Sequence, residues 1–234
     1  MEIIPKNTKG LYLFEGVNET LVPEEIAMQI RSFMDAENLY LSACREIVTK
    51  LENLNSEFKY TQERNPIHNI SSRVKSPVSI MQKLQQRGHE LSVESAKKHL
   101  TDIAGVRVIC SYIKDIYLIG DLLASQDDVQ LVRKSDYIKN PKPNGYRSLH
   151  LIVTIPVFQS SKTELVNVEI QIRTIAMDFW ASLEHELAYK LEEEQKQAIY
   201  SELKVCASQI SDIDQRMQKL HNNISLLKKN KVEE

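Results

Sequence analysis

Basic side chains concentrated in the middle of the chain are the first candidates for chemistry. Residues 68–150 contain 13 Lys or Arg against 8 Asp or Glu, although the whole 234-residue chain has a net charge of −2. An Arg side chain offers a planar face to a base and forked donors to a phosphate, whereas a Lys side chain offers a point charge. A nucleotide is therefore a candidate ligand, and the alternative for each cluster alone is a solvated surface. The clusters comprise Arg73, Lys75, Lys83 and Arg87, then Arg107, and then Lys139, Lys142 and Arg147.

Segment 136–150 has a composition suited to nucleotide recognition. It contains two prolines, a glycine, two asparagines and two tyrosines, and it lies between two expected strands. In such a loop Tyr146 could stack on a base and Asn144 could bind the edge of that base. Lys142 and Arg147 could then lie near phosphates, and the alternative is a solvated turn.

Two acidic side chains add a candidate metal site. Asp102 precedes the strand-rich core, and Glu169 lies in the last expected strand. Together they would suit Mg²⁺, which takes one or two protein carboxylates plus substrate phosphates. Their spacing in the sequence does not show that the two carboxylates lie close together in the fold, and a lone acid is more often a surface residue.

Several familiar sites are excluded by spacing. The 6 glycines form neither the dinucleotide-binding pattern nor the P-loop pattern, so side chains must hold any phosphate. Glu184-His185-Glu186 begins like a zinc-protease helix, but Tyr189 stands where the second His is required. The 3 cysteines have no close Cys or His partner, which indicates a reducing compartment rather than a disulfide or zinc framework.

The composition is that of an ordinary globular protein, with 42% hydrophobic residues. No apolar run approaches the roughly 18 residues that a membrane span needs, and the first residues lack the features of a signal peptide. We therefore expect a soluble, cytoplasmic protein without membrane contact. The near-neutral total charge gives no argument for nucleic acid from bulk charge.

The hydrophobic pattern predicts an α+β fold. Residues 1–22 are expected to form an irregular arm, and Pro23 starts a helix whose apolar stripe runs to about residue 55. Further helices are predicted over 77–87, 94–100 and 116–124, and strands over 69–75, 103–113, 129–138, 149–157 and 165–173. In the last strand Val166, Val168, Ile170 and Ile172 share one face, and Asn167, Glu169, Gln171 and Arg173 share the other. The apolar face should be core, and the polar face should meet either water or a ligand in a mixed sheet of about five strands.

The chain after residue 174 is expected to be helical to near its end. Nine residues there alternate spacings of four and three, which is typical of a helix that packs against another helix in the chain or in a second subunit. The alternative is an ordinary amphipathic helix on its own core. This apolar seam comprises Ile199, Leu203, Cys206, Ile210, Ile213, Met217, Leu220, Ile224 and Leu227.

Five ordered motifs together resemble the (p)ppGpp synthetase family. They lie at 73–83, 102–107, 136–150, 168–174 and 177–190, so the resemblance covers about residues 68–190. The chain is similar to the small alarmone synthetases, the short single-domain branch, because it has no His-Asp dipeptide for the hydrolase domain of long members and ends at residue 234. The resemblance implies a nucleotidyltransferase-like mixed sheet flanked by helices. It also implies that ATP donates its β,γ-pyrophosphate to the ribose 3′-OH of GDP or GTP, which yields AMP and ppGpp or pppGpp.

The resemblance further implies roles on the ATP side of the site. Arg73 and Arg107 would sandwich adenine. Lys75, Ser79 and Lys83 would contact the ATP phosphates. The chain departs from many members in having Gln85 and Gln86 before Arg87, where those members have an arginine, and this leaves one phosphate contact open.

On the acceptor side the resemblance implies that Tyr146 stacks on guanine, with Asn144 on its edge and Lys142 and His150 serving the acceptor. Asp102 would bind Mg²⁺. Glu169 would act on the 3′-OH as base and share the metal. Positioning and neutralisation of charge are what such a transfer needs most.

The resulting organisation is an arm over 1–22, a catalytic domain over 23–190 and a helical oligomerisation segment over 191–234, which by resemblance forms a homotetramer. Met177 and Trp180 are expected in the core, with Glu184 and His185 supporting the site from behind. Two alternatives stay open. One is a catalytically silent module that binds nucleotide or single-stranded RNA, and the other is a different nucleotidyltransferase.

Overall fold

The structure is a computed structural model that describes residues 24–62, 64–189 and 193–230. The predicted arm and the predicted boundary at 190/191 lie outside the described residues. Within them, five strands form one sheet in the order β1-β2-β5-β4-β3. β2 and β5 are parallel and the other neighbours are antiparallel, so the predicted mixed sheet is confirmed. The strands are β1 (Ile67–Val74), β2 (Ala104–Cys110), β3 (Gln130–Asp136), β4 (Leu149–Phe158) and β5 (Thr163–Thr174).

Six helices occur in the described ranges, and several element boundaries differ from the sequence prediction, three of them for a clear physical reason. The first helix continues beyond residue 55 because the buried Phe58 prolongs its apolar stripe. The strand predicted to reach residue 113 ends at Cys110, because Ile113 already starts the next helix. β3 ends at Asp136, whose side chain accepts hydrogen bonds from the N–H groups of the two residues at 138 and 139. The helices are α1 (Glu24–Gln62), α2 (Pro77–Gln86), α3 (Val93–His99), α4 (Ile113–Ala124), α5 (Ile175–Tyr189) and α6 (Glu193–Asn230).

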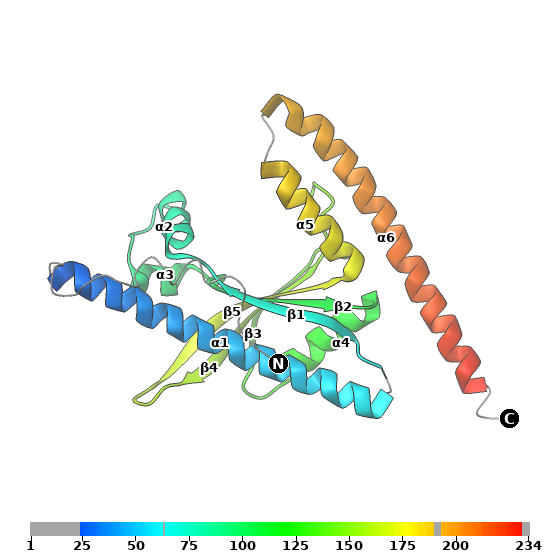
Figure 1. Cartoon of the computed structure of the whole chain (residues 1–234), viewed down its shortest axis with the longest axis horizontal. Helices are drawn as coiled ribbons and strands as arrows, with labels where there is room; N and C mark the ends of the chain where they lie inside the picture. Colours follow the sequence, from blue (N-terminus) through cyan, green and yellow to red (C-terminus); the bar gives the residue numbers. More distant parts are fainter. Residues whose placement is uncertain (1–23, 63, 190–192, 231–234) are drawn as a thin grey trace.

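The main core lies between one face of the sheet and the helices α1 and α4, which run along the same side of it (Figure 1). The four apolar residues of β5 that share a face are all buried there, as predicted. Gly120 allows α4 to come close to the sheet, because a β-carbon at this position would lie 3.1 Å from Leu149 Cδ2. The opposite face of the sheet carries the polar side chains of β1, β2, β4 and β5.

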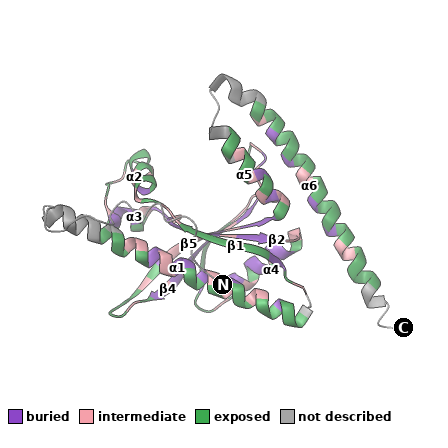
Figure 2. Ribbon diagram, in the orientation of Figure 1, coloured by how far each residue is buried: buried purple, intermediate pink, exposed green. Residues whose placement is uncertain are grey.

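The long helix α6 turns most of its apolar seam away from its own subunit. Ile213, Met217, Leu220 and Ile224 are each at least half exposed, and Figure 2 shows this outer side in green. The side of α6 that faces the subunit is instead partly polar, since Asp214 and Gln218 are buried there. Packing on the chain's own core therefore accounts only for the N-terminal part of the seam, where Leu203 is buried.

None of the helices in the described parts of the chain has a stretch long and apolar enough to span a bilayer.

Candidate active site

The polar face of the sheet forms the floor of an open pocket. Strand register places its side chains side by side: Arg73 lies opposite Gly105, Gly105 opposite Glu169, and Arg107 opposite Gln171. Because residues two apart on a strand point to the same face, these side chains share one surface. Asp102, just before β2, also lines the pocket. The fold thus brings together both predicted acids and the two arginines predicted to hold adenine.

Asp102 is the centre of a cluster of positive charge. Lys75 Nζ donates a hydrogen bond to Asp102 Oδ2 over 2.6 Å, and Lys83 donates to the same oxygen. Burial opposes ionisation of Asp102, but the hydrogen bonds and charges of the two lysines outweigh it, so the pKa of this carboxyl lies below its ordinary value. Asp102 is therefore ionised at neutral pH.

The second oxygen of the same carboxylate suits a cation. Asp102 Oδ1 is buried and has no hydrogen-bond partner. A buried, unpaired carboxylate oxygen beside the Glu169 carboxylate fits Mg²⁺, which needs few protein ligands when phosphates complete its shell. In the described ranges no group of three His, Cys, Asp or Glu side chains is placed to hold a metal ion. Asp102 and Glu169 are the two carboxylates that line this pocket.

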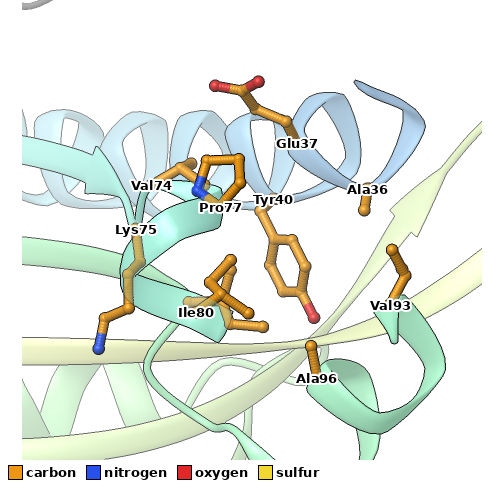
Figure 3. A pocket seen from close by; sticks show the side chains of 10 residues that line it. Ala36, Glu37, Tyr40, Val74, Lys75, Pro77, Ile80, Val93 and Ala96 are labelled. Atoms are coloured by element: carbon orange, nitrogen blue, oxygen red, sulfur yellow. The ribbon is translucent and has the colours of Figure 1, made fainter. Parts of the chain in front are cut away.

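Packing of α1, α2 and α3 sets the position of Lys75. The three helices line a small pocket whose side chains are mainly apolar, including Pro77 and Ile80 (Figure 3). Figure 3 shows the Lys75 side chain extending away from the Tyr40 ring. Burial, and then the charge of Glu164, raise the pKa of Tyr40 to about 12, so Tyr40 is a neutral packing residue here. Ser79 lies in the first turn of α2, where its backbone N–H donates to the capping Ser76 Oγ.

Glu169 is held from both sides. Gln171 Nε2 donates to Glu169 Oε2 over 2.9 Å, and His150 Nδ1 lies 3.3 Å from Glu169 Oε1. Burial raises the pKa of Glu169 and the nearby charge of Asp102 adds to this, but the contacts from His150 and Gln171 prevail and the pKa is lowered. The carboxylate is therefore ionised and fixed in direction.

A chain of polar contacts joins Glu169 to the predicted guanine-stacking residue. Tyr146 Oη lies 2.8 Å from His150 Nε2, and Arg173 Nη2 donates to Tyr146 Oη over 2.6 Å. Because Arg173 only donates, Tyr146 Oη accepts that bond, and the hydroxyl proton remains available for the contact with His150 Nε2. The network fixes the hydroxyl end of the Tyr146 ring.

The remaining acceptor-side residues lie around the same ring. Lys142 Nζ is 4.9 Å from the centre of the Tyr146 ring. Asn144 Oδ1 accepts from the Tyr146 N–H over 3.2 Å, and Asn144 Nδ2 donates to Glu184 Oε1 over 3.2 Å. The expectation that Glu184 supports the site from behind agrees with this contact, while the side chain of His185 lies outside the described residues.

Two basic residues of the predicted clusters contact backbone oxygens. Arg147, expected near phosphates, donates to the backbone oxygen of Ile138 over 3.1 Å. Arg87, whose contact with phosphate was left open, donates to the backbone oxygen of His99 at the end of α3. Both arginines connect neighbouring segments through hydrogen bonds to backbone oxygens. The residue type alone does not distinguish this role from that of a phosphate ligand.

Sequence reasoning assigned no role to Arg173 and Asp178, which the structure places between the two sides of the site. Arg173 is 5% exposed, and its guanidinium lies 3.1 Å from Asp178 Oδ1. The same oxygen of Asp178 lies 3.5 Å from Arg107. The signal that could have indicated Arg173 is its place in the polar alternation of β5. Met177 and Trp180 are both buried, as predicted.

Comparison with known proteins gives one consistent result. Residues 72–194 match the family model described as a region found in RelA / SpoT proteins. The chain is 46% identical to the GTP pyrophosphokinase YwaC of Bacillus subtilis over 179 residues, which cover 76% of this chain and 85% of that protein. It is 33% identical to the GTP pyrophosphokinase YjbM of the same organism over 188 residues, or 79% and 86% of the two chains.

Solved structures agree with this assignment. The crystal structure of small alarmone synthetase 1 from Bacillus subtilis bound to its product pppGpp has a TM-score of 0.74 and 31% identity, and the match covers 85% of this chain and 99% of that one. Small alarmone synthetase 2 from the same organism has a TM-score of 0.72 and 40% identity, with 82% and 98% covered. The two acids on the floor of the pocket and the five motifs all lie within the matched region. The chain belongs to the RelA/SpoT family, among its small alarmone synthetases.

Proposed function

We propose that this protein is a GTP pyrophosphokinase that transfers the β,γ-pyrophosphate of ATP to the ribose 3′-OH of GDP or GTP. The observation that carries the proposal is the pair of ionised carboxylates, Asp102 and Glu169, on one pocket floor between the two arginines of β1 and β2 and the ring of Tyr146. The 3′-oxygen forms a bond to the β-phosphorus of ATP. The bond from that phosphorus to the α,β-bridging oxygen breaks, and AMP leaves with this oxygen.

On the ATP side, Arg73 and Arg107 are the proposed adenine contacts, and Lys75, Ser79 and Lys83 the proposed phosphate contacts. When ATP binds, the two lysines would exchange their hydrogen bonds to Asp102 Oδ2 for hydrogen bonds to phosphate oxygens. A phosphate, like a carboxylate, is a negatively charged acceptor of short hydrogen bonds from an ammonium group. Asp102 and Glu169 would hold Mg²⁺, which supplies neutralisation of the developing charge on the transferred group. The lysines supply the rest of that neutralisation.

On the acceptor side, Glu169 is the proposed base for the 3′-OH. Its lowered pKa keeps it ionised, and its orientation by His150 and Gln171 leaves it ready to receive the hydroxyl proton as the new bond forms. Tyr146 is proposed to stack on guanine, with Asn144 at the base edge and Lys142 near the phosphates of GDP or GTP. Holding both nucleotides in line on one rigid sheet face is the main contribution of the fold.

A chromatographic assay tests this function. The protein is incubated with ATP, Mg²⁺ and either GDP or GTP, and the nucleotides are resolved by anion exchange. We expect AMP and ppGpp, or AMP and pppGpp, in equal amounts. Binding of both nucleotides without AMP formation would favour the silent binding module instead, and an adenylylated or other product would favour a different nucleotidyltransferase.

We also propose that the outward part of the apolar seam joins subunits, with a homotetramer as the expected assembly. An exposed apolar ridge of this length on a folded protein is typical of an interface. Met217→Lys with Ile224→Lys should lower the mass measured by light scattering coupled to size exclusion, whereas a wild-type monomer would refute the interface. Single-stranded RNA and a cytoplasmic location remain predictions, the first tested by filter binding and the second by cell fractionation.

A further inference from the structure

The tip of the loop over residues 139–146, here called the acceptor loop, lies directly against α6. Gly145 has φ +94° and is buried. A β-carbon built on Gly145 would lie 2.6 Å from Ala207 Cβ and 3.5 Å from Lys204 Cα, which is too close for the first pair. The positive φ and the close approach each require glycine at this position. Loop backbone and helix therefore meet at a point with no room for one more methyl group.

Tyr146 itself packs on the helices next to this point. Trp180, Leu203 and Ala207 form a small buried cluster separate from the main core, and Tyr146 is one of the partly buried residues packed against it. Trp180 Nε1 donates to the backbone oxygen of Leu203 over 2.8 Å, which fastens α5 to α6. The hydroxyl end of Tyr146 is thus fixed by the sheet, and the apolar part of the side chain is supported by α5 and α6.

Polar contacts fix where α6 lies along the rest of the subunit. Thr174 Oγ1, at the end of β5, donates to Asp214 Oδ2 over 2.5 Å. The backbone N–H of Lys114, in the first turn of α4, donates to Gln218 Oε1 over 2.9 Å. Buried polar pairs of this kind have directional geometry, so they set the register of a helix more sharply than apolar contacts do. The position of Ala207 relative to the sheet is therefore defined.

We propose that α6 forms a wall of the acceptor site, with Ala207 as a positioning residue that seats Gly145 so that Tyr146 can stack on guanine. The inference rests on the proposed role of Tyr146. It goes beyond that role because it assigns to α6, whose other side carries the exposed apolar seam, a direct part in acceptor binding. The ATP contacts lie on β1, β2 and α2, and none of them touches this point, so the two nucleotides should respond differently to a change at Ala207.

Ala207→Leu tests the wall by adding bulk at the closest point. We expect KM for GDP and GTP to rise about tenfold or more, since displacement of a binding group by about 1 Å can cost up to 10²-fold, with KM for ATP within about twofold of wild type. Ser208→Leu is the matched control, because it makes a similar change at the next, exposed residue of the same helix, outside the seam. Equal changes in KM for both nucleotides would show a merely structural role, and an unchanged acceptor KM would overturn the inference.

A second pair of variants keeps the test valid if Ala207→Leu unfolds. Gly145→Ala should weaken GDP binding measured by calorimetry, and Ala207→Gly in the same chain should restore part of that binding. The steric clash of the new methyl group depends on Ala207, whereas the backbone strain of the positive φ at residue 145 does not. GDP affinity of the single variant Ala207→Gly completes the double-mutant cycle. Strictly additive effects would overturn the inference. GDP binding without synthesis by the wild type would reject the proposed function alone, whereas a wild type that does not bind GDP would reject both.

Discussion

On the proposed acceptor side of the pocket, direct hydrogen bonds join Arg173 to Tyr146 and Tyr146 to His150, and His150 Nδ1 lies 3.3 Å from Glu169 Oε1. On the ATP side, by contrast, two lysines converge on a single carboxylate oxygen of Asp102, and the side chain of Arg73 is exposed. The acceptor side is thus already arranged for its ligand. On the proposed ATP side, Asp102 compensates the positive charge of Lys75 and Lys83 until phosphates and a cation bind. A substitution on the acceptor side should therefore disturb the geometry of the site, whereas a substitution on the ATP side should disturb its charge balance.

The largest effects should come from the two acids, one on each side. We expect Asp102→Asn and Glu169→Gln each to reduce synthesis by at least about 10²-fold, since each removes a metal or base contribution to the transition state. Asp102→Asn should also weaken binding of ATP with Mg²⁺, whereas Glu169→Gln should leave the affinity for GDP near wild type. Initial rates of AMP and ppGpp formation give the first result and calorimetry the second. Asp121→Asn, at an exposed acid, is the control, and near-normal synthesis by both variants would remove these acids from the mechanism.

Tyr146→Ala should affect the acceptor side alone. A stacked base is worth on the order of 1 to 3 kcal/mol by truncation, so GDP affinity should fall about tenfold to 100-fold while ATP affinity changes little. Separate calorimetric titrations of GDP and ATP measure this. Tyr60→Ala, at a side chain 87% exposed, is the control. An equal loss of both nucleotides would mean that the ring is a packing residue or that the two pockets are exchanged.

Lys83→Met is the mirror test on the ATP side. It keeps the length of the side chain and removes the charge that now compensates Asp102. We expect KM for ATP to rise about tenfold, as for loss of one charge-assisted hydrogen bond, with KM for GDP unchanged. Lys97→Met is the matched control, because Lys97 pairs with Glu164 away from the pocket. A selective rise in KM for GDP would contradict the division of the pocket into two sides.

The sequence was sufficient for the strands and for the two faces of β5, because these depend on local regularities. The alternation along β5 predicted which face is buried and put Glu169 on the opposite, polar face. The sequence was insufficient where contacts between distant segments decide the structure, and spacing did not show that Asp102 and Glu169 line one pocket. The contact of Gly145 with Ala207 joins segments 62 positions apart, and the inward side of α6 includes the polar Asp214 and Gln218, which a hydrophobic pattern does not count. The roles of Arg147 and Arg173 likewise depend on which acceptor lies within reach.

The smallest predicted effect that separates the two sides is a shift in the pH dependence of kcat, which reports the ionisation of Glu169. Its pKa is lowered because His150 and Gln171 together outweigh burial and the charge of Asp102. An ionised base loses activity as pH falls through its folded-state pKa, so the acidic limb of the kcat profile should lie below the ordinary range for a glutamate.

Gln171→Met removes the weaker of these two supports while it keeps a side chain of similar length. The pKa of Glu169 should then rise, because burial is less opposed, and the acidic limb of kcat should move to higher pH. His150→Phe should move it further in the same direction, since His150 contributes more to the lowering. Gln130→Met, at an exposed position on β3, is the control and should leave the profile in place. If the limb moved to lower pH in Gln171→Met, or stayed where it is in both variants, Glu169 would not be the group whose ionisation limits the reaction, and the idea that the acceptor side is arranged in advance around an ionised base would fail.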